Sequence, residues 1–174
     1  GTSVGDMDRI RNVAERVIRT AQAGNSVVVV LSAMSGVTDT LLKMAHEASD
    51  HPDKREMDVL LSTGEQTTVA LLSMMLNSMG QAAISLLGYQ ADIVTNDDSM
   101  NARIQSIGAQ KIATHLEHGK IVVIPGFQGQ TENGDITTLG RGGSDTSAVA
   151  IAAAMNADVC EIYTDVDGIY TTDP

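Results

Sequence analysis

The chain has 174 residues, of which 43% are hydrophobic and 2% aromatic, and its formal net charge is −11. This charge opposes binding to nucleic acid, and so few aromatic side chains leave little surface for stacking on bases. No run approaches the roughly 18 apolar residues of a membrane span and no signal-like segment opens the chain, so we expect one soluble, cytoplasmic domain without a membrane partner.

The first half of the chain alternates helices with strands. Apolar residues at helical spacing predict a helix over residues 6–23, and the run Val27-Val28-Val29-Val30-Leu31 predicts a strand that is buried on both faces. A polar loop over residues 32–39 leads into a helix that ends near residue 49. A longer helix is predicted over residues 55–79. This alternation indicates an α/β fold.

The second half continues the same pattern. It predicts strands at residues 82–87, 121–124 and 159–163, an extended piece at 93–95, a polar hairpin tip at 130–135, and helices at 103–118 and 146–155. The last helix consists of Ala, Val, Ile and Met, which predicts that it is buried against the sheet. Cys160 lies in an apolar run, so we expect a buried structural thiol rather than a nucleophile.

Residues 137–150 form the most informative stretch. Three glycines, Gly140, Gly142 and Gly143, precede a helix, and Ser144, Asp145 and Thr146 are of the types that cap helices. Such a loop can bring backbone N–H groups and the positive end of a helix dipole close to an anion. The spacing fits neither a Walker A motif nor G-x-G-x-x-G. An ordinary glycine-rich turn that caps a helix remains the alternative.

Three other polar groups have both a functional and a structural explanation. Glu65 interrupts an apolar pattern, and it is either a functional carboxylate or a first-turn carboxylate favoured by a helix dipole. His115 and His118 are better explained as a solvated helix end than as metal ligands. Asp165 and Asp167 have EF-hand-like spacing, but a strand precedes them, so calcium is not expected. We therefore predict no metal site built by the protein alone.

Four polar loops follow predicted strands, at residues 32–39, 125–129, 139–145 and 164–173. In a parallel sheet such loops converge on one edge, where ligands of open α/β sheets bind. Their glycines, hydroxyls and carboxylates are suited to a phosphate-rich ligand.

These loops resemble the catalytic domain of the aspartate kinases, within the amino-acid kinase family. Residues 1–4 match the end of the family's K-F-G-G-T-S-V opening, and residues 32–39 match its S-A-M-x-x-x-T-D loop. Thr63-Gly64-Glu65 matches its G-E element. Residues 137–145 match T-T-L-G-R-G-G-S-D, and residues 164–174 match T-D-V-D-G-[IV]-Y-T-x-D-P. Five elements in this order cover essentially the whole chain.

The resemblance implies a three-layer αβα sandwich with a mainly parallel central sheet. It implies transfer of the γ-phosphoryl group of ATP, with Mg²⁺, to the β-carboxylate of L-aspartate, the first step towards lysine, threonine and methionine. The full-length enzyme is then expected to be a homo-oligomer with regulatory ACT domains.

The resemblance also assigns roles to single residues. It implies that Arg141 binds the substrate carboxylate, that Glu65 binds its ammonium group, and that Asp145 organises the reacting groups. The remaining substrate contacts that it implies are Thr38, Asp39, Gly142, Gly143 and Ser144, and the nucleotide contacts are Gly1, Thr2, Ser3, Ser32, Thr164, Asp165, Tyr170 and Asp173.

Neither Gly1 nor Pro174 resembles a natural chain boundary, so we expect a fragment. The family's catalytic lysine lies just upstream of Gly1, so the fragment alone is expected to have little or no kinase turnover. Three alternatives remain open: a related acetylglutamate or glutamate kinase, a non-catalytic assembly or regulatory subunit, and an enzyme fused to a homoserine dehydrogenase.

Overall fold

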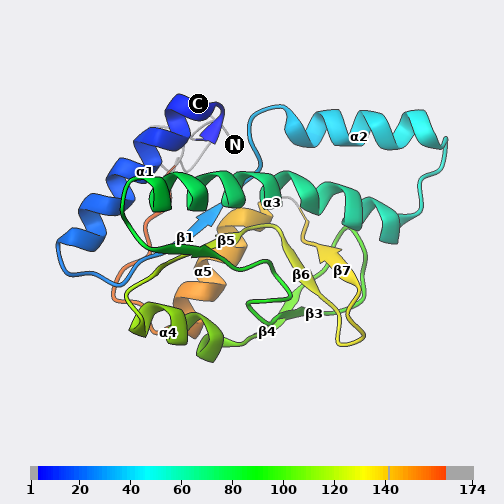
Figure 1. Ribbon diagram of the computed structural model, residues 1–174. Helices are drawn as coiled ribbons and strands as arrows, with labels where there is room; N and C mark the ends of the chain where they lie inside the picture. The colour runs from blue at the N-terminus through cyan, green and yellow to red at the C-terminus, as the bar shows by residue number, and fades with distance from the viewer. Residues whose placement is uncertain (1–3, 141, 164–174) are drawn as a thin grey trace, which may run out of the picture.

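A computed structural model describes residues 4–140 and 142–163 of the chain. Its helices are α1 (Met7–Gln22), α2 (Val37–Ala48), α3 (Lys54–Ser78), α4 (Ala109–Glu117) and α5 (Gly143–Ala154). Its strands are β1 (Val28–Leu31), β2 (Ala83–Ser85), β3 (Ile93–Thr95), β4 (Ile104–Ile107), β5 (Ile121–Pro125), β6 (Gln128–Gln130) and β7 (Ile136–Thr138). The predicted α/β fold is confirmed (Figure 1).

Two helices begin at aspartate caps that the sequence places before an apolar pattern. Asp6 accepts a hydrogen bond from the backbone N–H of Arg9 at the start of α1, and Asp53 accepts from Arg55 and Glu56 at the start of α3. Side-chain caps of this kind satisfy N–H groups that have no partner inside the helix.

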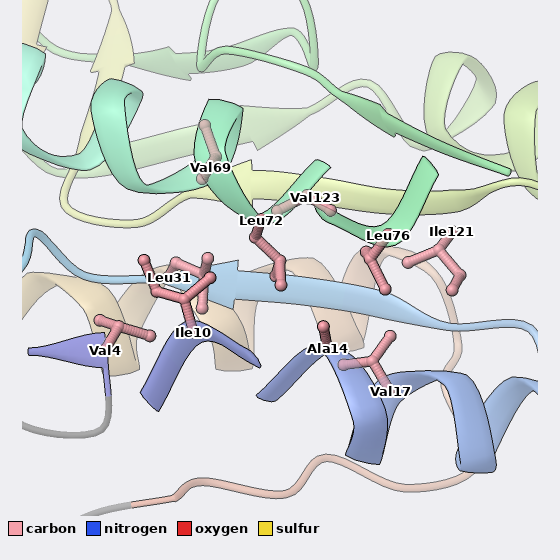
Figure 2. Packing of buried hydrophobic residues seen from close by; sticks show 10 residues of the cluster. All are labelled: Val4, Ile10, Ala14, Val17, Leu31, Val69, Leu72, Leu76, Ile121 and Val123. Atoms are coloured by element: carbon pink, nitrogen blue, oxygen red, sulfur yellow. The ribbon is translucent and has the colours of Figure 1, made fainter. Parts of the chain in front are cut away.

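A parallel sheet with the strand order β1-β5-β2 forms the central layer. Central β5 is buried along its whole length, and its side chains alternate between two apolar clusters. Ile121 and Val123 pack with α1 and α3, as Figure 2 shows, whereas Val122 and Ile124 pack with Ile112 of α4 and Ile151 of α5. The three layers are therefore α1 and α3, the sheet, and α4 and α5 (Figure 1).

A second, mixed sheet has the strand order β4-β3-β6-β7. Strands β6 and β7 form an antiparallel hairpin whose tip, residues 131–135, is closed by backbone hydrogen bonds, which agrees with the predicted hairpin tip. Helix α3 packs on β7 as well as on β2 and β5, so it joins the two sheets. Residues 125–128 join them a second time, because they carry the chain directly from β5 into β6.

Helix α3 is long and apolar enough to cross a membrane by length and composition alone. Half of its apolar window is buried inside the protein, and the buried face includes Asp58 and Glu65. A core helix explains its composition, since it packs on α1, α2 and strands of both sheets.

Several element predictions were wrong. Ile104–Ile107 does not begin a helix but forms β4, because it pairs with β3, and the helix starts only after Gly108. Helix α5 begins at Gly143, inside the glycine stretch, behind a left-handed Gly142 cap, and no side chain of the described residues caps it. Its predicted burial against the sheet is confirmed by Ile151, which packs with β5, although Val149 is 54% exposed.

Two further corrections concern the ends of the core. Strand β1 lies at the edge of its sheet, so only Leu31 of its four residues is fully buried. Residues 159–163 are not a strand, because nothing pairs with them in the part of the chain that the structure describes. Their side chains are consequently exposed, and Cys160 is an exposed thiol rather than a buried one.

Candidate active site

A cavity of about 300 Å³ opens where α2, α3, α5 and the loop after β5 meet. Its lining combines three hydroxyl residues, two carboxylates, one aromatic ring and a backbone rich in glycine. The lining residues are Ser32, Thr38, Glu65, Phe127, Gly140, Gly142, Gly143, Ser144 and Asp145.

Two helices present their N-terminal ends to this cavity. Thr38 lies in the first turn of α2, and Ser144 and Asp145 lie in the first turn of α5. Both helices begin behind a left-handed glycine, Gly36 with φ of 76° and Gly142 with φ of 77°, and no described side chain caps either of them. The N–H groups and positive dipole ends of these helices therefore favour an anion in the cavity.

Glu65 projects into the cavity from the middle of α3 and is only 4% exposed. Its Oε1 accepts a hydrogen bond of 3.2 Å from the backbone N–H of Ala33, whereas Oε2 is buried without a partner among the described residues. Burial raises the pKa of the Glu65 carboxyl from 4.5 to about 6, although the Ala33 N–H opposes this rise. Because Glu65 lies far from the start of α3, the first-turn explanation of this carboxylate is wrong.

The far wall of the cavity is the turn between β5 and β6. A Cβ on Gly126 would lie 2.8 Å from both Cα and Oγ of Ser144, so only glycine allows this approach to α5. The next residue, Phe127, has φ of 69°, and its N–H donates to Oγ of Ser147 at 3.0 Å. Ser147 in turn donates to the carbonyl of Gly143 at 2.8 Å, which ties the turn to the first turn of α5.

No positively charged side chain of the described residues lines the cavity. Lys43 and Lys111 form ion pairs with Glu47 and Asp92, and none of the chain's four lysines lines the cavity. Among residues 4–140 and 142–163, no group of three or more His, Cys, Asp or Glu side chains could hold a metal ion. Any positive charge that the described part of the cavity itself supplies comes from helix dipoles.

Seven of the residues singled out from the sequence lie together around the cavity: Ser32, Thr38, Glu65, Gly142, Gly143, Ser144 and Asp145. Asp39, also singled out, is exposed on α2 and does not line it. Gly1, Thr2, Ser3, Arg141, Thr164, Asp165, Tyr170 and Asp173 lie outside the described residues.

Sequence reasoning did not single out Phe127 as a lining residue, although residues 125–129 were recognised as a loop on the ligand edge. A bulky residue with positive φ between Gly126 and Gln128 gives no local signal of that conformation, because left-handed backbone at such a position is imposed by tertiary contacts.

Comparisons with known proteins agree on one family. The model of the family described as "Amino acid kinase family" matches residues 1–174. Aspartokinase of Geobacillus stearothermophilus is 58% identical over 100% of this chain and 43% of its own length, and aspartokinase 2 of Bacillus subtilis is 57% identical with the same coverage. The chain therefore spans less than half the length of these curated relatives.

Solved structures give the same result. Aspartate kinase from Synechocystis superposes with a TM-score of 0.83 at 54% identity, covering 100% of this chain and 29% of that one. Aspartokinase III of E. coli, in complex with aspartate and ADP, has a TM-score of 0.86 at 28% identity, covering 100% of this chain and 49% of that one.

Proposed function

The chain belongs to the amino acid kinase family, and we propose that it forms part of the catalytic domain of an aspartate kinase. In the proposed reaction an oxygen of the β-carboxylate of L-aspartate attacks the γ-phosphorus of ATP, and the bond from that phosphorus to ADP breaks. The products are 4-phospho-L-aspartate and ADP. This acyl phosphate would supply the synthesis of lysine, threonine and methionine in the cytoplasm.

The observation that carries the proposal is the environment of Glu65. A carboxylate that is buried, has one unpartnered oxygen and lines a cavity is costly unless the ligand brings a positive group. The α-ammonium group of an amino acid supplies such a group. N-acetylglutamate has no ammonium, so this feature argues against an acetylglutamate kinase.

The two helix N-termini support the binding of anions in the cavity. Backbone N–H groups of Gly142 and Gly143 and the hydroxyls of Ser32 and Ser144 are suited to phosphate and carboxylate oxygens. Phosphoryl transfer depends mainly on positioning and on stabilising charge, which these groups provide without covalent chemistry. Mg²⁺ commonly binds through substrate phosphates and one or two carboxylates, and Asp145 is the carboxylate that lines the cavity beside the helix end.

We assign the other substrate contacts to Arg141 and Thr38, Arg141 gripping a carboxylate through two N–H groups. The nucleotide contacts proposed for residues 1–3 and 164–173 rest on the family motifs alone. Without the family's lysine the 174-residue chain is expected to turn over slowly, whereas the complete protein is expected to be active.

The test is an ADP-release assay on the complete protein with aspartate, glutamate and N-acetylglutamate as acceptors. We expect turnover with aspartate and little with the other two. Arg141→Ala should raise the KM for aspartate more than tenfold, while Arg11→Ala, on the exposed face of α1, should leave it unchanged. The proposal would be contradicted if ADP release by the wild-type protein did not depend on aspartate, or if the KM for aspartate were unchanged in Arg141→Ala.

A non-catalytic assembly or regulatory role remains the competing function from a different class. It predicts that isothermal titration of the complete protein detects binding of neither ATP nor aspartate.

A further inference from the structure

Asp58 is a fully buried carboxylate on α3 that the proposed chemistry does not use. Its Oδ1 accepts hydrogen bonds from the Thr138 hydroxyl at 2.5 Å and from the Thr138 backbone N–H at 3.1 Å. The backbone N–H of Met100 donates to both carboxylate oxygens, at 3.0 and 3.2 Å. These donors lie 42 and 80 residues along the chain from Asp58.

Nothing positive offsets this charge within the described residues. Their ion pairs involve other groups, so the carboxylate is stabilised by two backbone N–H groups and one hydroxyl. Hydrogen bonds to both oxygens offset part of the free energy lost in burying this carboxylate, but without a cation they need not offset all of it, and a neutral residue of the same size would avoid the loss. A carboxylate at this position therefore calls for an explanation beyond packing.

The donors to Asp58 belong to the two segments that hold the glycine loop, which contains Gly140, Gly142 and Gly143. Thr138 precedes Leu139 and Gly140, and its carbonyl accepts from the N–H of Ala102 at 3.0 Å. A Cβ on Gly140 would lie 2.8 Å from Oδ1 of Asn101, so the 100–102 turn packs directly on the loop. Met100 itself has φ of 68°, a conformation that a hydrogen bond to Asp58 helps to hold.

Asp58 and Glu65 are seven residues apart on one helix, so they point from nearly the same face, about 10 Å apart along the axis. Glu65 faces the cavity directly, and Asp58 fixes the end of β7, from which the glycine loop enters the cavity. A single rigid helix thus sets both sides of the cavity relative to each other.

We propose that Asp58 is a positioning residue that fixes the distance between the glycine loop and Glu65, and thereby the fit of an amino-acid substrate between them. The inference rests on the proposed function, in which Glu65 binds the ammonium group and the loop binds a carboxylate. It predicts that loss of Asp58 impairs use of the amino acid far more than use of ATP.

The test measures steady-state kinetics of the complete protein and its Asp58→Asn variant. In the amide an NH2 group replaces the oxygen Oδ2 and opposes the Met100 N–H that donates to it, so we expect the KM for aspartate to rise about tenfold or more and the KM for ATP to stay within about twofold. Thr138→Val, which removes only the hydroxyl, should raise the KM for aspartate by a smaller factor, and Thr138→Ser should restore it.

The matched control is Asp53→Ala, which removes the N-cap of the same helix without touching the loop. It should lower thermal stability while leaving the KM for aspartate within about twofold. The inference is refuted if Asp53→Ala raises that KM as much as Asp58→Asn does, or if aspartate and ATP are affected equally. If Asp58→Asn does not fold, the KM values for aspartate and ATP of Thr138→Val and Thr138→Ser provide the test. The inference is then refuted if Thr138→Val changes both KM values equally. A wild-type protein without aspartate-dependent turnover would instead refute the proposed function.

Discussion

Replacing Glu65 by Gln should make the protein more stable at neutral pH while weakening the binding of its amino-acid substrate. The pKa of Glu65 is raised from 4.5 to about 6 by burial. Below pH 4.5 the carboxyl is protonated in the folded and in the unfolded protein, and its burial then carries no cost of ionisation. Relative to that state the folded protein loses stability as the pH rises from 4.5 through 6, because the unfolded protein ionises first. At 1.36 kcal/mol per pKa unit, the ionised carboxylate costs about 2 kcal/mol above pH 7.

The measurement is urea unfolding of the complete protein and the Glu65→Gln variant at pH 5 and pH 8. Part of the cost is already present at pH 5, so the stability advantage of the variant should grow by about 1 kcal/mol between the two pH values. The control is Glu56→Gln, an exposed change on the same helix, which should alter stability by less than about 0.5 kcal/mol at both. A pH-independent difference between Glu65→Gln and the wild type would refute the reasoning.

The same carboxylate should impose a pH dependence on substrate binding. An ammonium group favours ionised Glu65, so binding of aspartate releases a proton near pH 6. If only the ionised form binds, the dissociation constant for aspartate should be about tenfold higher at pH 5 than at pH 8. Calorimetry in two buffers of different ionisation enthalpy measures both the affinity and the proton release. Binding without proton release at pH 6 would show that Glu65 does not meet the ammonium group.

Two further predictions concern packing. Gly126→Ala should lower kcat/KM of the complete protein more than tenfold, because the new Cβ would lie 2.8 Å from Ser144 and displace the start of α5. Gly119→Ala is the control for general destabilisation, because its Cβ meets nothing within 4 Å while its φ of 70° strains an alanine. Equal losses of activity in both variants would contradict this role of Gly126. Ser73→Ala should leave the free energy of unfolding unchanged or raise it by up to about 1 kcal/mol, because the buried hydroxyl has no partner among the described residues. Urea unfolding checks this, and a clear loss of stability would reveal a partner for Ser73.

The parts of the fold that could be predicted from the sequence depend on local rules. The apolar periods of α1 and α3 and the buried run of β5 each follow from a few neighbouring residues. The parts that could not be predicted depend on a distant partner. Residues 104–107 form a strand because β3 lies beside them, and residues 159–163 form none because no described strand does.

The same division applies to the candidate site. Glycines and hydroxyls of the loops around the cavity stand out because their residue types suit anions, and the sequence singled them out. Phe127 and Asp58 were missed, since their roles depend on distant contacts, the backbone N–H of Phe127 with Ser147 and the Asp58 carboxylate with Thr138 and Met100. A carboxylate inside an apolar helical pattern is nevertheless a signal, because such a group must find donors or lose stability.

Helix α3 explains why this signal occurs twice at an interval of seven residues. Each residue turns the helix by 100°, so seven residues bring the side chain back to within about 20° of its first direction. An interval of three or four residues would also keep both carboxylates on the cavity side, but it would roughly halve the distance between the two side chains. Any other small interval would point one carboxylate away from the cavity side. Because a helix resists bending more than a loop does, we expect two carboxylates on it to hold the Glu65 side of the cavity and the glycine loop at a constant separation. The free energy lost in burying both charges is therefore best understood as the cost of a fixed cavity.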